Sequence, residues 1–172
     1  MNQKFNKTFK IIIEGARNPG KTQLFCELLN KNYNEAEIGP ELGIEIVQYQ
    51  NINYKLQIWD THRQYNHMKL ATMHYKGTHV VLIVFDVGNI ETFNLCSMYI
   101  EQIRSNCHQN TQIMLVGQQF NYIRQVRIDE PILLAEMNNI TYTEINYLED
   151  TQQAIILLKQ RITALAITNE YQ

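Results

Sequence analysis

An N-terminal segment of the chain has the residue types and spacing of a phosphate-binding loop. It reads Gly15-Ala16-Arg17-Asn18-Pro19-Gly20-Lys21-Thr22 and satisfies the pattern GxxxxGK(S/T). Glycines in such a loop let backbone N–H groups converge on phosphate oxygens, and the N-terminus of the next helix favours negative charge. In this chemistry Lys21 reaches the β- and γ-phosphates of a nucleotide, and the Thr22 hydroxyl ligates Mg²⁺. The alternative is a chance match at an ordinary strand–turn–helix junction.

The segments around this loop alternate between strand and helix patterns. A β-branched apolar run predicts a buried strand before the loop, and an apolar stripe predicts a helix after it. The expected strands are 9–13, 44–49, 54–59, 80–87, 112–116 and 140–145, and the expected helices are 22–31, 92–104, 129–138 and 151–167. The polar residues 50–53 are suited to a hairpin turn. The alternation favours an α/β fold with a mostly parallel sheet.

The composition is that of a globular protein. The chain has 172 residues, of which 45% are hydrophobic and 19% charged, and its length predicts one domain, residues 1–172. A formal net charge of −2 argues against nucleic-acid binding. The three cysteines form no CxxC pair, which argues against a disulfide framework and a cysteine-based zinc site. With neither a signal peptide nor a long apolar run, we expect a cytoplasmic protein.

Further segments extend the pattern beyond the loop. They are KLQIWDT at 55–61, HYKGTH at 74–79, VFDV at 84–87, ETF at 91–93 and LVG at 115–117. With the phosphate loop, they make the chain resemble a Ras-superfamily small GTPase, and most of all the Rab branch. The resemblance runs from about residue 9 to residue 166. It implies a P-loop G-domain with a six-stranded, mostly parallel sheet, one antiparallel edge strand and five flanking helices.

The resemblance also implies a ligand and its contacts. The ligand is GTP or GDP with Mg²⁺, and the metal-site residues are Thr22, which binds the ion, and Asp60, which positions it through a water. Gln64 matches the residue that positions the attacking water. The residues that match the nucleotide contacts are Gly15, Asn18, Pro19, Gly20, Lys21, Thr22, Gln118 and Asn121.

The chain departs from the family pattern in both switch segments. No Ser or Thr lies between Thr22 and Thr61, so the first switch lacks the Thr that binds Mg²⁺; Pro40 or Glu41 takes its place. In the second switch, Arg63 replaces a glycine whose backbone senses the γ-phosphate. Without that Thr and Gly, Gln64 is more consistent with a bystander than with a catalyst.

Base recognition departs as well. The family's NKxD reads Gln118-Gln119-Phe120-Asn121 here, and its SAK loop aligns with Asn146-Tyr147-Leu148. Asn121 offers guanine one acceptor oxygen and an NH₂ group that faces a donor, so we expect guanine selectivity to be weak or lost. Arg17 and Asn18 stand where Ras has two glycines, and Asn tolerates positive φ, so the loop can still form. Arg17 either folds over the phosphates as an extra cation or fills their site itself.

Two other features bear on partners. The chain ends without a CaaX, CC or CxC prenylation signal, so we expect no direct membrane anchor.

Four histidines fall on a loop, a helix and a strand edge in the resemblance, which favours solvated side chains over a zinc site: His62, His67, His74 and His79.

These departures favour a pseudo-GTPase. It would hold a nucleotide weakly or permanently and act as a structural or adaptor subunit of a protein assembly, by analogy one of cilia or trafficking. One alternative is a divergent GTP-binding enzyme with slow hydrolysis that uses Lys21, Thr22, Asp60 and Gln64. The other is a protein-binding module without a nucleotide, in which Arg17 occupies the phosphate site.

Overall fold

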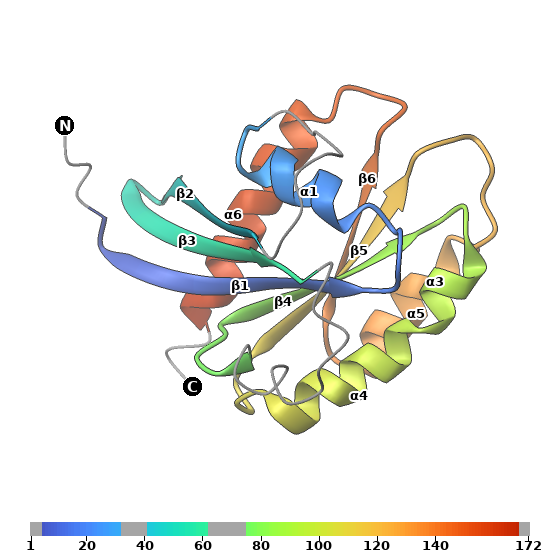
Figure 1. The fold of residues 1–172 in the computed structure, drawn as a ribbon, viewed down its shortest axis with the longest axis horizontal. Coiled ribbons are helices and arrows are strands. Elements are labelled where there is room, and N and C mark those ends of the chain that lie inside the picture. Colours follow the sequence, from blue (N-terminus) through green and yellow to red (C-terminus); the bar gives the residue numbers. More distant parts are fainter. Residues whose placement is uncertain (1–4, 32–40, 62–74, 169–172) are drawn as a thin grey trace.

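The computed structural model describes residues 5–31, 41–61 and 75–168, and it contains a six-stranded sheet with helices on both faces (Figure 1). The strand order is β2-β3-β1-β4-β5-β6. The strands are β1 Lys7–Gly15, β2 Glu41–Tyr49, β3 Ile52–Asp60, β4 Val80–Asp86, β5 Gln112–Gln119 and β6 Thr141–Asn146. All neighbours pair in parallel except β2 with β3. The predicted fold class is therefore confirmed.

The helices of the described residues are α1 Lys21–Leu28, α3 Ile90–Asn94, α4 Cys96–Asn106, α5 Asp129–Met137 and α6 Gln152–Thr168. One helix was expected over 92–104, and that prediction is wrong. α3 begins earlier because the Asn89 side chain accepts from the Glu91 N–H, and α3 ends at Asn94. The Thr92 hydroxyl ties α3 to the Asp86 carbonyl at the end of β4 (3.2 Å), whereas α4 packs its own buried stripe on the sheet. α3 is thus fixed to the end of β4 and α4 to the face of the sheet, and the two helices are separated at Leu95.

The hairpin between β2 and β3 lies where the sequence predicts it. Its turn residues Gln50 and Asn51 have φ values of 49° and 63°, a left-handed conformation that suits a two-residue hairpin turn. β2 and β3 are longer than expected, since their ladder begins with the pair Glu41 and Asp60. β2, the first strand of the hairpin, therefore begins beside the last residue of β3.

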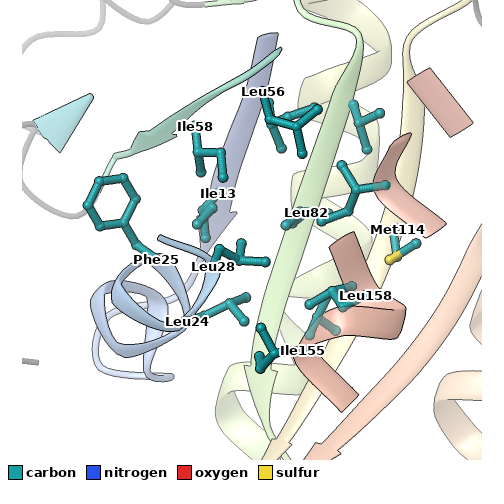
Figure 2. Close-up of a cluster of buried hydrophobic side chains, with 14 of the residues drawn as sticks. Ile13, Leu24, Phe25, Leu28, Leu56, Ile58, Leu82, Met114, Ile155 and Leu158 are labelled. Carbon is teal, nitrogen blue, oxygen red and sulfur yellow. The ribbon is translucent and has the colours of Figure 1, made fainter. Parts of the chain in front are cut away.

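The sheet separates two apolar layers. Alternate residues of β1 point to opposite faces, so Ile11 and Ile13 join the apolar layer that includes side chains of α1 and α6, whereas Ile12 joins the layer under α3, α4 and α5. Figure 2 shows the first layer, in which side chains of α1 and α6 meet those of the central strands. Because β1 is hydrogen-bonded to β3 on one side and to β4 on the other, the loop that follows it starts from an interior strand of the sheet.

No helix within the described ranges is long and apolar enough to cross a membrane. Cys26, Cys96 and Cys107 form no disulfide bond in the part of the chain that the structure describes. Burial raises the pKa of Cys96 to about 12 and that of Cys107 to about 11, so both stay protonated at neutral pH. Neither thiol has the lowered pKa of a reactive cysteine.

Candidate functional site

The GxxxxGK(S/T) segment lies between β1 and α1, as the sequence predicts. Three of its residues have positive φ: Gly15 at 140°, Asn18 at 63° and Gly20 at 86°. Gly15 also lies so close to β4 that an added Cβ would sit 2.2 Å from the Val84 carbonyl oxygen. Glycine meets both needs, and Asn tolerates the left-handed region better than most residues. The loop thus forms with Asn18 in place of a glycine.

Lys21 is the first residue of α1 and lies inside the loop. Its side chain is 2% exposed, and its ammonium donates to the Gly15 carbonyl at 2.9 Å and to the Ala16 carbonyl. Burial lowers the pKa of Lys21, while the carboxylates of Asp60 and Glu14 oppose that shift. The two carbonyls hold the cation at the start of the helix, where a phosphate would also be favoured.

Thr22 and Asp60 meet although they are far apart in the sequence. The Thr22 hydroxyl donates to Asp60 Oδ2 at 2.7 Å, and Asp60 is 5% exposed at the end of β3. The Thr61 hydroxyl donates to the Ile13 carbonyl at 2.7 Å and fixes the chain just after β3. A hydroxyl and a carboxylate are hard oxygen ligands of the kind that Mg²⁺ prefers. Beside the loop, this pair fits a metal ion bound together with phosphates.

Arg17 does not fill the loop, since its side chain is exposed. Asn18 is also exposed, whereas Pro19 is buried. Of the two roles considered for Arg17, occupation of the phosphate site by its own guanidinium does not match this placement.

The end of β5 carries the residues predicted to contact a base. Gln118 is fully buried, and its Nε2 donates to the Gly20 carbonyl at 3.4 Å, whereas its Oε1 has no hydrogen-bond partner among the described residues. Asn121 is exposed, and its Oδ1 accepts from the Ile123 N–H at 2.8 Å. The structure therefore brings Gln118 to the phosphate loop and engages the Asn121 acceptor within its own turn.

One ring of an aromatic pair also reaches the loop. Phe120 and Tyr147 stack with ring centroids 4.8 Å apart at 15°, and a Cβ added to Gly20 would lie 2.4 Å from Phe120 Cζ. The sequence patterns do not predict this pair, although each of its two residues directly follows a strand. Gln119 pairs with Asn146 across β5 and β6, so the aromatic residues follow paired positions at the carboxyl edge of the sheet.

Other predicted site residues fall elsewhere. Arg63, Gln64 and Pro40 lie outside the described residues. Glu41 begins β2, where its backbone pairs with Asp60. His79 lies at the edge of β4, and its Nδ1 accepts from the Lys10 N–H at 3.1 Å. Of the four histidines, His62, His67 and His74 lie outside the described ranges, and no metal-binding cluster occurs within those ranges.

Comparison with known proteins agrees with this geometry. A model of the Ras family matches residues 10–163. The chain is 30% identical over 148 residues to Ras-related protein Rab-1 of Theileria annulata, covering 83% of this chain and 67% of the relative. It is 26% identical over 155 residues to Ras-related protein rab-11.1 of Caenorhabditis elegans, covering 87% and 74%. For Ras-related protein Rab-11A of Dictyostelium discoideum, identity is 25% over 154 residues, covering 87% and 72%. The chain belongs to the Ras family of small GTPases and is a Rab-like member of it.

Proposed function

We propose that this Rab-like chain binds a nucleotide through its phosphates and acts as a structural or adaptor subunit of a protein assembly, not as a cycling GTP switch. The observation that carries the proposal is a contrast within the site. Lys21 lies against the Gly15 carbonyl in the loop, and Thr22 and Asp60 meet beside it, which supports binding of phosphates and Mg²⁺ there. The base-recognition residue Asn121 is exposed, with its acceptor engaged.

The phosphate half supports binding of GTP or GDP with Mg²⁺, the ligands that the family implies. Lys21 and the backbone N–H groups at the start of α1 would hold the phosphates. Thr22 and Asp60 would hold Mg²⁺, and the bound ion would neutralise phosphate charge. These residues orient the ligand whether or not hydrolysis follows.

The switch sequences support a role without cycling. No hydroxyl side chain lies between Thr22 and Thr61, so the first switch has no Thr to follow the γ-phosphate. Arg63 stands in place of the second switch's glycine. Each change removes a contact that distinguishes GTP from GDP, and a ligand shifts a conformational equilibrium only by its differential affinity. A chain with both changes has little means of responding to hydrolysis.

The exposed surface supports protein partners. α5 leaves three apolar side chains largely in solvent: Ile132 at 42% exposure, Leu133 at 50% and Met137 at 86%. Leu133 and Met137 are four residues apart and so lie on one face of the helix, and exposed apolar side chains that form a patch are typical of protein–protein contacts. Membership of a cilium- or trafficking-related assembly stays a prediction.

The proposal is tested by identifying what the purified protein carries and whether it turns over. Denatured protein should release a nucleotide, and added ligand with Mg²⁺ should raise the unfolding temperature by linkage. Lys21→Ala should abolish both effects, whereas Lys76→Ala, which removes an exposed lysine, should change neither. No released ligand together with no thermal shift would contradict phosphate binding.

The second candidate is a slow GTP-hydrolysing enzyme, which the retained Gln64 favours. Steady GTP turnover that Gln64→Leu abolishes would support this enzyme and contradict the scaffold role. Turnover at the background rate in both proteins would support the scaffold.

A further inference from the structure

We propose that Phe120 and Tyr147 fill the base side of this site, so that the P-loop selects a di- or triphosphate group by its phosphates and discriminates weakly among bases. The inference rests on the proposed phosphate binding and adds the chemical class of ligand. It concerns the space between the phosphate loop and the carboxyl ends of β5 and β6.

When the phosphates of a nucleotide are bound in the loop, the position of the loop restricts where the attached base can lie. Parallel α/β sheets bind ligands outside the carboxyl ends of their strands. Here β5 ends at Gln119 and β6 at Asn146, and Gln118 joins the end of β5 to Gly20 through the 3.4 Å hydrogen bond from Nε2 to the carbonyl. The end of β5 therefore adjoins the loop at Gly20, and β6 ends beside β5.

Side chains of the protein already occupy this position. A Cβ on Gly20 would lie 2.4 Å from Phe120 Cζ, 2.7 Å from Gln118 Oε1 and 3.0 Å from Phe120 Cε2. The Phe120 ring therefore packs directly on the Gly20 backbone. A base could reach this face of Gly20 only after the ring had moved.

Tyr147 holds the Phe120 ring in place. The two rings stack at 4.8 Å and 15°, within the roughly 4.5–7 Å range over which aromatic pairs attract each other. The Tyr147 hydroxyl is buried, and burial together with Glu27 raises the pKa of Tyr147, so the ring stays neutral. The Tyr147 N–H also donates to the Gln119 carbonyl at 2.8 Å. Because Tyr147 stacks on Phe120, that face of the Phe120 ring is not available to stack on a base.

The polar groups at this edge are poorly placed to read a base. Asn121 Oδ1 accepts from the Ile123 N–H, and Gln119 Nε2 donates to the Asn121 carbonyl at 3.2 Å. Gln118 Oε1 is fully buried against Gly20 without a partner among the described residues. This oxygen faces the phosphate loop, so it is placed to accept a hydrogen bond from a ligand bound there. Asn121 Oδ1 and Gln119 Nε2 are already bonded within the protein, so fewer polar atoms at this edge are available to discriminate between bases.

The test compares ligands that share phosphates and differ in the base. Isothermal titration with Mg²⁺ should give Kd values for pyrophosphate, ADP and GDP that agree within about threefold. A preference of about tenfold or more for GDP over both others would overturn the inference while leaving phosphate binding intact. If pyrophosphate binds no better to the wild-type protein than to Lys21→Ala, the proposed function itself fails. This comparison needs no aromatic variant to fold.

A variant then assigns the effect to Phe120. Phe120→Ala should open the space and tighten ADP and GDP relative to pyrophosphate by about tenfold, because base contacts become available. Tyr122→Ala removes an aromatic side chain in the same loop that is 88% exposed, and it should leave all three affinities unchanged. Equal affinities in a folded Phe120→Ala protein would contradict the role of Phe120.

Discussion

The Thr22 hydroxyl donates to Asp60 Oδ2 across 2.7 Å and thereby joins the first turn of α1 to the last residue of β3. Thr22 belongs to the phosphate-loop motif, and Asp60 lies 38 residues further along the chain. The hydrogen bond holds two metal-ligand candidates within reach of one ion.

This pair predicts how ligand binding depends on metal. Asp60→Asn replaces a charged metal ligand by a neutral one, so the gain in pyrophosphate affinity between EDTA and Mg²⁺ should fall by about tenfold. Titration calorimetry with and without Mg²⁺ measures it. Asp129→Asn changes an exposed carboxylate on α5 and should keep the full gain. An unchanged metal dependence in Asp60→Asn would remove Asp60 from the metal site.

The contact of Lys159 with Glu45 predicts a stability effect that links α6 to β2. Lys159 Nζ lies 2.7 Å from Glu45 Oε1 and 3.2 Å from Asn30 Oδ1, and the two charged side chains are 9% and 18% exposed. Lys159→Met leaves the carboxylate without its cation and should lower the free energy of unfolding by about 1–3 kcal/mol.

Urea unfolding measures this loss. Gln160→Met, on the exposed side of the same helix, is the matched control and should change stability little. In the double variant Lys159→Met/Glu45→Gln, part of the loss should be recovered. Strictly additive effects of the two substitutions would mean that the pair is not coupled.

Arg124 and Glu144 predict a pH dependence. Two parallel hydrogen bonds from Arg124, at 2.8 and 2.9 Å, lower the pKa of Glu144 from its ordinary 4.5. A lowered folded-state pKa stabilises the protein above pH 4.5, and the stabilisation is lost as pH falls through the folded-state value. Glu144→Gln should therefore cost about 1 kcal/mol near pH 7 and progressively less below pH 4.5.

Urea unfolding at neutral and acidic pH tests this prediction. Glu149→Gln, at an exposed position after β6, should show no such pH-dependent difference. A cost for Glu144→Gln that is the same at both pH values would mean that the Glu144 charge does not contribute.

Two glycines with positive φ predict different costs of substitution. In Gly15→Ala the new methyl would meet the Val84 carbonyl at 2.2 Å, a backbone atom that cannot turn away. In Gly77→Ala nothing lies within 4 Å, so only the strain at φ 70° remains. We expect about 1 kcal/mol for Gly77→Ala and at least about 3 kcal/mol, or failure to fold, for Gly15→Ala. Equal unfolding midpoints would contradict the close approach of β1 and β4.

The sequence predicts those parts of the fold that depend on near neighbours in the chain. The phosphate loop, the two-residue turn at Gln50 and the buried strand β4 each follow from residue type and spacing over a few positions. The break at Leu95 was not predicted, because the apolar stripe runs across it and Thr92 is attached to β4 through tertiary contacts.

The same limit applies to the site. Lys21 and Thr22 could be placed from their motif alone. The stacking of Phe120 on Tyr147 and the packing of Phe120 against Gly20 depend on the register of β5 with β6 and on the position of α1. Single-sequence patterns carry no information about those distances.

The packing of Phe120 on Gly20 affects how the protein would respond to its surroundings in a cell. A fold whose pocket is completed by a ligand gains stability as the concentration of that ligand rises. Here the protein's own rings complete one side, so that side contributes nothing to such a gain. The stability of this chain should accordingly follow free phosphate compounds and Mg²⁺ more closely than it follows the cellular ratio of guanine to adenine nucleotides.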